Sequence, residues 1–160
     1  MTEKYIVING KRAELTEEQL RQLGIKVPKT NPFTKSHKGK QYWRICTDGN
    51  VRDFTDNNDI VANDLYLVAN YCTDKAIMEQ RALHETLNRL LWRYSMEHEG
   101  DITIENLKYT VRYHANERWS VGSITPVHFG TVFFASREIA QNAIKEIIEP
   151  FMAAHPDFKW

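Results

Sequence analysis

The stretch FGTVFFASREIAQNAIKEIIEPFM, residues 129–152, decides the fold that this chain is expected to adopt. An apolar run predicts a strand over residues 127–134, and Ser136 stands where a helix N-cap residue belongs. The apolar residues that follow recur at helical spacing, at Ile139, Ala143, Ile144, Ile147 and Phe151. We therefore expect a strand that leads directly into a capped amphipathic helix.

A looser copy of this stretch lies earlier in the chain, in LVANYCTDKAIMEQRALHETLNRLLW, residues 67–92. At a constant offset, Asp74 of the copy aligns with Ser136. The copy predicts a strand over residues 65–72, a cap at Asp74 or the residue before it, and a helix that ends before Gly100. The predicted apolar face of that helix comprises Ile77, Leu83, Leu87, Leu90, Leu91 and Tyr94.

An alternating strand, a turn and a second alternating strand precede each copy. In the first copy the strands are Tyr42–Cys46 and Val51–Phe54, joined by a turn at Asp48-Gly49. In the second copy they are Tyr109–Tyr113 and Trp119–Val121. Each copy therefore has the order hairpin, third strand, capped helix, which predicts an internal repeat of the βββα type.

Two such repeats, at about residues 41–99 and 107–155, would form one domain over 41–160 with antiparallel sheets covered by helices. One unit alone leaves a sheet face and a helix face uncovered, whereas two units bury both. The first copy has a longer connection before its third strand, TDNNDIVAND. A chance likeness is the alternative, because any strand, cap and helix junction shares this pattern.

The first 27 residues predict a small ββα unit. A strand over 5–8 and a return strand over 11–15 flank an Asn-Gly turn, and a capping box from Thr16 to Gln19 starts a short helix. The inner face of this helix would carry Leu20 and Leu23, and the helix would end at Gly24. Residues 28–40, rich in Pro, Ser, Thr and Gly, predict a linker or an exposed loop. The expected fold class is α+β.

Composition and charge narrow the function classes. The 160 residues are 42% hydrophobic and 26% charged, with zero net charge, as in soluble globular proteins. No apolar run reaches membrane-spanning length and no export signal is visible, so we expect a cytoplasmic protein that does not contact membranes. Cys46 and Cys72 are then expected to be unpaired. Zero net charge argues against a general nucleic-acid binder.

The charges are nevertheless separated along the chain. Residues 19–47 contain no acidic residue, and residues 48–64 contain five aspartates and only one basic residue. Such blocks of like charge are typical of interaction segments. The candidate partner-binding residues of the two segments are Lys29, Lys35, Lys38 and Lys40 in the basic one, and Asp53, Asp56 and Asp59 in the acidic one.

The hairpins add aromatic candidates. Tyr42 and Trp43 are adjacent on a strand, so one of them must face away from a sheet covered on one side. Exposed aromatic residues beside arginines can stack on bases or cover a partner protein. We therefore add Trp43, Arg44, Arg112 and Trp119 to the candidate partner-binding residues. The alternative is ordinary cross-strand pairing that stiffens each hairpin.

No catalytic, metal or cofactor site is predicted. The six histidines and two cysteines lack metal-ligand spacing, and HETLN, residues 84–88, has Asn88 where a zinc-protease helix needs a second histidine. The chain has no glycine-rich phosphate loop. Cys46 or Cys72 paired with His114 or His128 could act as a nucleophile, but both cysteine positions favour small buried side chains.

The chain resembles a group of small proteins encoded by phages and prophages of Firmicutes. The resemblance rests on INGK with ELTEEQLRQLGI, on NPF with KGKQYWRICTDGNV, and on the stretch quoted first. In that group the hairpin reads Tyr-x-x-Ile-x-x-Asp-Gly-x-Val, matched here by Tyr42, Ile45, Asp48, Gly49 and Val51. A Gly-Asn-x-Phe-x-Thr segment of the group is weakened here, with Ala69 at its glycine. The resemblance carries no catalytic motif.

What the resemblance implies is an accessory protein of a mobile element, acting in the cytoplasm of the bacterial host. Small phage proteins of this kind are often inhibitors of host or defence systems, of the anti-CRISPR or another anti-defence type. We therefore expect a non-enzymatic protein, without cofactors, that binds a host or defence protein. The alternatives are a nucleic-acid-binding accessory protein and a small-nucleotide binder. The sequence does not assign an oligomeric state.

Overall fold

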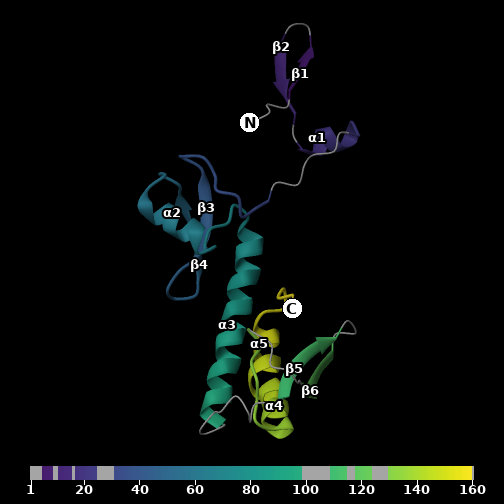
Figure 1. Cartoon of the computed structure of the whole chain (residues 1–160). Coiled ribbons are helices and arrows are strands. Elements are labelled where there is room, and N and C mark those ends of the chain that lie inside the picture. The colour runs from purple at the N-terminus through teal and green to yellow at the C-terminus, as the bar shows by residue number, and fades with distance from the viewer. Residues whose placement is uncertain are drawn as a thin grey trace.

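A computed structural model of the chain describes residues 5–8, 11–15, 17–24, 31–98, 109–114, 118–123 and 130–159. These residues form a mixed fold of helices and three separate two-stranded antiparallel sheets. The long helix α3, Lys75–His98, is its central element, with one hairpin and a short helix near its start and a second hairpin and helix along its later part (Figure 1).

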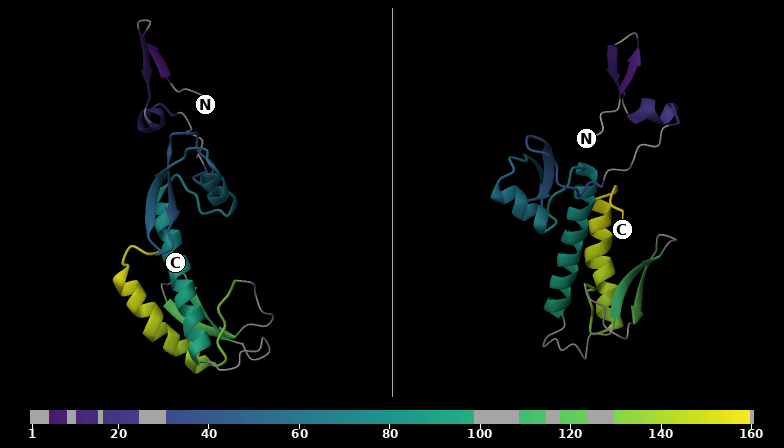
Figure 2. Two further views of the ribbon diagram at one scale, coloured as in Figure 1. Left: turned by 90° about the vertical axis from the view of Figure 1, so that its left-hand side faces the viewer. Right: turned by 45° about the horizontal axis from the view of Figure 1, so that its top comes forward.

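The first unit contains the predicted hairpin and helix. Strands β1 (Tyr5–Ile8) and β2 (Lys11–Glu14) pair, and α1 spans Glu17–Gln22. The Asn-Gly turn and Thr16 lie outside the described residues. Leu20 is buried as predicted, but the prediction for Leu23 was wrong, because that residue follows the last helical residue and is 60% exposed. In Figures 1 and 2 this unit lies beyond the end of the molecule that holds β3 and β4.

The first predicted hairpin of the repeat is confirmed. Strands β3 (Gln41–Ile45) and β4 (Val51–Thr55) pair in antiparallel register, and Gly49 takes the positive φ of 81° that the connecting turn requires. The ring of Tyr42 stacks on that of Tyr71, with the centroids 4.3 Å apart. These two tyrosines and Ala62 form a small apolar core.

The predicted strand over residues 65–72 was wrong. Residues Ile60–Leu67 form helix α2, because the Asp59 carboxylate accepts a hydrogen bond from the N–H of Ala62 and so caps a helix there. Only Cys72 pairs as in a strand, in a single bridge with Trp43 whose two N–H···O distances are 2.7 and 3.0 Å.

The segment predicted as a linker is irregular from residue 31 to residue 40, yet it is bonded to the unit that follows it. The carbonyl of Pro32 accepts hydrogen bonds from the N–H and the hydroxyl of Thr73. The N–H of Gly39 donates to the carbonyl of Asp56, and the N–H of Asp56 donates to that of Lys40. These bonds lengthen the β3–β4 ladder beyond its last strand residues.

Helix α3 starts and ends where predicted. The Asp74 carboxylate accepts from the N–H of Ile77 at 3.1 Å and caps it. The prediction that Ile77 belongs to the buried face was wrong, since it is 39% exposed. The buried face begins instead with Met78 and Ala82, and it continues through the predicted Leu87, Leu91 and Tyr94.

The last predicted hairpin and helix are also present. Strands β5 (Tyr109–His114) and β6 (Arg118–Ser123) pair, with the turn residues 115–117 outside the described part. Helix α4 (Arg137–Ala143) follows, and the Ser136 hydroxyl caps it by accepting from the N–H of Ile139. Figures 1 and 2 show this helix and its continuation alongside α3.

A π-helical segment, η1 (Ile144–Ile148), joins α4 to α5 (Glu149–Ala154). The N–H of Glu149 bonds to the carbonyl of Ile144, five residues back. The next residue is Pro150, which has no N–H to donate, so the wider turn lets the helix continue past it. Ile148 in this segment, which the predicted apolar face did not include, lies in the core with no exposed surface.

The predicted strand over 127–134 is reduced, in the described residues 130–134, to one bridge. Phe134 pairs with Tyr109 through N–H···O bonds of 3.1 and 2.8 Å. Phe134 is fully buried and belongs to the larger core, which α3 shares with α4, η1 and α5. That core includes Leu87, Leu91, Tyr94, Ala140, Ala143, Ile148 and Phe151.

Candidate partner-binding surface

The outer side of α2 carries four large hydrophobic side chains that are more than half exposed. Ile60, Val61, Leu67 and Val68 are 74, 52, 78 and 68% exposed. At about 100° per residue these four side chains fall on one side of the helix, opposite the buried Ala62. We call these four residues and Asp64, which lies among them, the α2 face. Large exposed aliphatic side chains gathered on one element mark an interaction site better than scattered ones do.

Charge on and around the α2 face is acidic. Asp64 is exposed and lies at the centre of the face, one helical turn from Ile60 and from Val68. Asp53 and Asp59, two predicted partner-binding residues, are exposed nearby in sequence. From residue 53 to residue 74 the sequence contains no Lys, Arg or His.

The inner side of α2 is held firmly. Ala62 is 1% exposed, and the ring of Tyr66 meets that of Tyr71 edge-on at 5.9 Å. Beyond the helix, the amide of Asn70 donates to the carbonyl of Ile45 at 2.9 Å and accepts from its N–H at 2.8 Å, as a strand neighbour would. The α2 face is therefore displayed on a fixed support.

A buried polar cluster fixes the same support to residues 31–40. Asp56 is fully buried, and it accepts hydrogen bonds from the hydroxyl of Tyr71 at 2.8 Å and from the N–H of Asn58 at 2.7 Å. Ser36 bonds to the same hydroxyl through its own hydroxyl and its N–H. Burial raises the pKa of Tyr71, so this phenol keeps its proton. Asp56, predicted as partner-binding, serves the fold here.

Of the predicted basic residues that the structure describes, one is bound within the fold and two are exposed. Lys29 lies outside the described residues, and Lys35 bonds to the side chains of Asn58 and Asn63 at the start of α2. Lys38 and Lys40 are exposed beside the Gly39 bond described above.

The candidate arginines and tryptophans of the hairpins make contacts within the fold. The guanidinium of Arg44 lies 3.9 Å from the ring centroid of Phe54, and the ammonium of Lys75 lies 5.4 Å from that of Trp43. Trp119 is half-buried and pairs with Tyr113 across the strands, with centroids 4.9 Å apart. Arg112 donates to the carbonyl of Ser123. The Arg44–Phe54 and Trp119–Tyr113 contacts are the cross-strand pairing considered as the alternative to a stacking platform, whereas the contact to Trp43 comes from helix α3.

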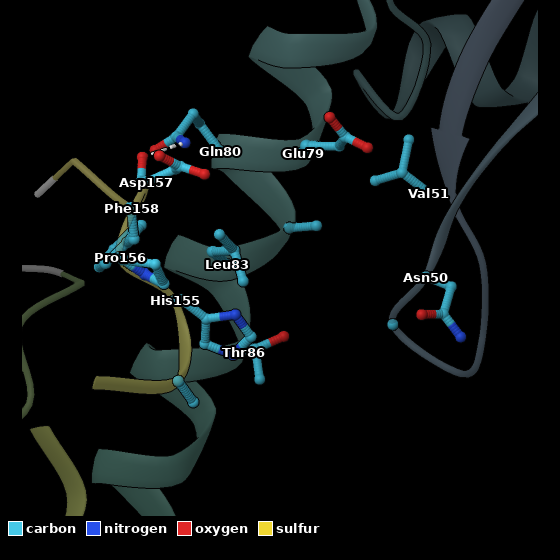
Figure 3. Close-up of a pocket in the computed structure, with 13 residues that line it drawn as sticks. Asn50, Val51, Glu79, Gln80, Leu83, Thr86, His155, Pro156, Asp157 and Phe158 are labelled. Carbon is cyan, nitrogen blue, oxygen red and sulfur yellow. Dashed lines mark hydrogen bonds between the residues drawn. The ribbon is translucent and has the colours of Figure 1, made fainter. Parts of the chain in front are cut away.

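A cleft of about 460 Å³ lies between the β3–β4 turn, the middle of α3 and the segment after α5 (Figure 3). Gln80 links two of its walls, donating to the carbonyl of Asp157 and accepting from the N–H of Lys159, both at 2.9 Å. The described lining residues include the carboxylates of Glu79 and Asp157 but no lysine or arginine. This charge disfavours a nucleotide phosphate.

Two of the predicted nucleophile candidates, Cys72 and His114, already have partners within the fold. Cys72 is fully buried, burial raises the pKa of its thiol, and its sulfur contacts the backbone of Asp74. His114 bonds to the hydroxyl of Ser120 at 2.6 Å, and His128 lies outside the described residues. Within the described ranges no three His, Cys, Asp or Glu residues could hold a metal ion together.

None of the helices in the described part combines the length and the apolar character that crossing a bilayer would need. Comparisons with protein-family models, with curated proteins and with solved structures find no match for this chain. The site therefore has to be interpreted from its own residues. Sequence reasoning missed the α2 face, although the Asp59 cap signal and the spacing of the four aliphatic residues were both visible.

Proposed function

We propose that this protein acts by binding another protein, has no reaction of its own, and uses the α2 face as its docking surface. The observation that carries the proposal is the set of four aliphatic side chains, each more than half exposed, on one side of a firmly anchored helix. A soluble domain that leaves such residues uncovered loses the stabilisation their burial would give, which a bound partner restores.

We further propose that binding inhibits or modulates the partner, and that the partner belongs to a bacterial host or to one of its defence systems. This part rests on the resemblance to phage and prophage proteins. The resemblance supports a location in the host cytoplasm and a function of the anti-defence type, including that of anti-CRISPR proteins.

The duplicated organisation is part of the same proposal. Cys72 and Phe134 each make one bridge to the first strand of the preceding hairpin, and Asp74 and Ser136 each cap the helix that follows. Cys72 aligns with Phe134, and Asp74 aligns with Ser136, at the same constant offset that suggested the repeat. On this view α2 is an insertion into the first repeat, and the insertion carries the docking surface.

Binding of nucleic acid is the competing function. The exposed Lys38 and Lys40 favour it, whereas Lys35, Arg44 and Arg112 are already engaged within the fold. Salt separates the two functions, because phosphate contacts lose affinity steeply as salt rises and an apolar protein interface does not.

The test is capture of bound material from host lysate by the wild-type protein and by Leu67→Asp. We expect one stoichiometric protein, retained at high salt, that the Leu67→Asp variant loses. The matched control is Trp92→Asp, which places the same charge at another exposed apolar residue, on α3. Capture of nucleic acid alone, or a partner lost from Trp92→Asp and kept by Leu67→Asp, would contradict the proposal.

A further inference from the structure

We infer that the α2 face recognises an amphipathic helix whose apolar stripe carries a lysine or arginine at its centre. This inference rests on the proposed docking function and names the chemistry of the partner. A helix is the natural counterpart of a short apolar helix face, because ridges of side chains on one helix fit grooves on the other.

The four aliphatic residues of the α2 face form two pairs. Ile60 and Val61 stand at one end and Leu67 and Val68 at the other, two helical turns apart. Asp64 lies between these two pairs along the helix axis. Its angular position around the axis is also between those of the four aliphatic residues. A carboxylate is thus ringed by four aliphatic side chains that would exclude water once a partner is bound.

Such a carboxylate requires a cation from the partner. An unpaired charge buried in an interface costs several kcal/mol, whereas a close opposite charge offsets that cost. Along the sequence the nearest basic residues are Arg52 and Lys75. Lys35 reaches the start of α2, but its ammonium is held there by the side chains of Asn58 and Asn63. Arg52 is itself paired with Asp48.

The same charge argues against a second copy of this chain as the occupant. A two-fold contact between two α2 faces would bring the two central Asp64 carboxylates close to one another. The exposed Asp59 would add like charge at the rim. Repulsion between these groups would oppose the burial of the aliphatic residues.

The test is selection from a displayed library of helical peptides in which the stripe is apolar and its central position is randomised. Wild-type protein is expected to enrich lysine or arginine at that position about tenfold over glutamate, a difference of about 1.4 kcal/mol. Asp64→Asn should remove the preference and Asp64→Arg should reverse it. Circular dichroism and thermal unfolding verify that each variant is folded.

The Leu67→Asp variant and a sedimentation measurement distinguish failure of this inference from failure of the docking function. Leu67→Asp should enrich no peptide; if the wild type also enriches none, both the proposed docking function and this inference fail. If peptides with a neutral or acidic centre are enriched and are lost from Leu67→Asp, the docking function stands and this inference is overturned. A concentration-dependent dimer in sedimentation that Leu67→Asp abolishes would overturn it in favour of a second copy.

Discussion

At the scale of single residues, sequence and structure differ most over Asp56. In DFTDNND it is one of several aspartates of an acidic segment, and charge alone predicts a solvated side chain. Its burial depends on Tyr71 and on Ser36, which lie 15 and 20 residues away along the chain (71 − 56 and 56 − 36). No local pattern encodes such a contact, so sequence reasoning could not distinguish Asp56 from the exposed Asp53 and Asp59.

The hydroxyl of Tyr71 should be important for stability. Tyr71→Phe leaves the buried Asp56 carboxylate and Ser36 without their shared partner, and we expect a loss of about 1–3 kcal/mol in the free energy of unfolding. Urea denaturation at neutral pH measures it. The matched control is Tyr66→Phe on α2, at a tyrosine that is 39% exposed, which should change stability by less than about 0.5 kcal/mol.

The buried phenols should also make the protein sensitive to alkali. Burial is the main cause that raises the pKa of Tyr42, Tyr71 and Tyr94, so the folded state keeps these protons after the unfolded chain, whose tyrosines titrate near pH 10, has lost them. Their contribution is fully present below about pH 10 and is lost as pH rises through the folded pKa values.

Urea midpoints measured at about pH 8, 9.5 and 11 test this expectation. The midpoint should fall between the last two, and Tyr42→Phe should make that fall smaller because one raised phenol is gone. A midpoint that stays constant up to pH 11, or a fall of equal size in the variant, would contradict it.

At the scale of elements, the sequence predicted those helices and hairpins whose formation depends on residues close together in the chain. The hairpins, the caps at Asp74 and Ser136 and the extents of the two long helices follow from turn residues, capping residues and apolar spacing. Helix α2 was missed because its β-branched and aliphatic residues suit a strand as well, and because its apolar side faces out. A docking surface violates the rule that apolar residues turn inward.

The two helix caps should be of similar importance. Asp74→Ala and Ser136→Ala each remove the acceptor of one N–H in the first helical turn, and each should cost about 1 kcal/mol in the free energy of unfolding. Ser136→Asp should restore stability, since aspartate caps equally well. Ser123→Ala, at an exposed strand end, is the matched control, and a loss there equal to that of Ser136→Ala would contradict the assignment.

At the scale of the whole molecule, α3 connects the unit that holds the smaller apolar core to the larger core. Its first turns lie against β3 and β4, and its later turns pack with α4, η1 and α5 around Leu91. The sequence predicted two units that close against each other. It predicted the helix between them but not that both units would pack along it, because that depends on which residues of α3 turn toward which unit.

Truncating a side chain of the larger core should therefore destabilise the elements around that core more than it destabilises β3 and β4. Leu91→Ala should cost about 2–5 kcal/mol and raise amide exchange most in α4, α5 and the β5–β6 hairpin. The outward Leu67→Ala on α2 should leave stability almost unchanged. Hydrogen-exchange mass spectrometry locates the effect, and equal exchange in β3 and β4 would show that the two cores unfold as one.

The division of α2 into an anchored side and an uncovered side has an evolutionary consequence. Ala62, on the buried side of the helix, is packed against the core, while Ile60, Val61, Leu67 and Val68 are mostly exposed. The outward residues can therefore be substituted, as a binding partner changes, with little loss of stability. Lineages of this protein should diverge fastest at those positions, and slowest at the aromatic and capping residues that carry them.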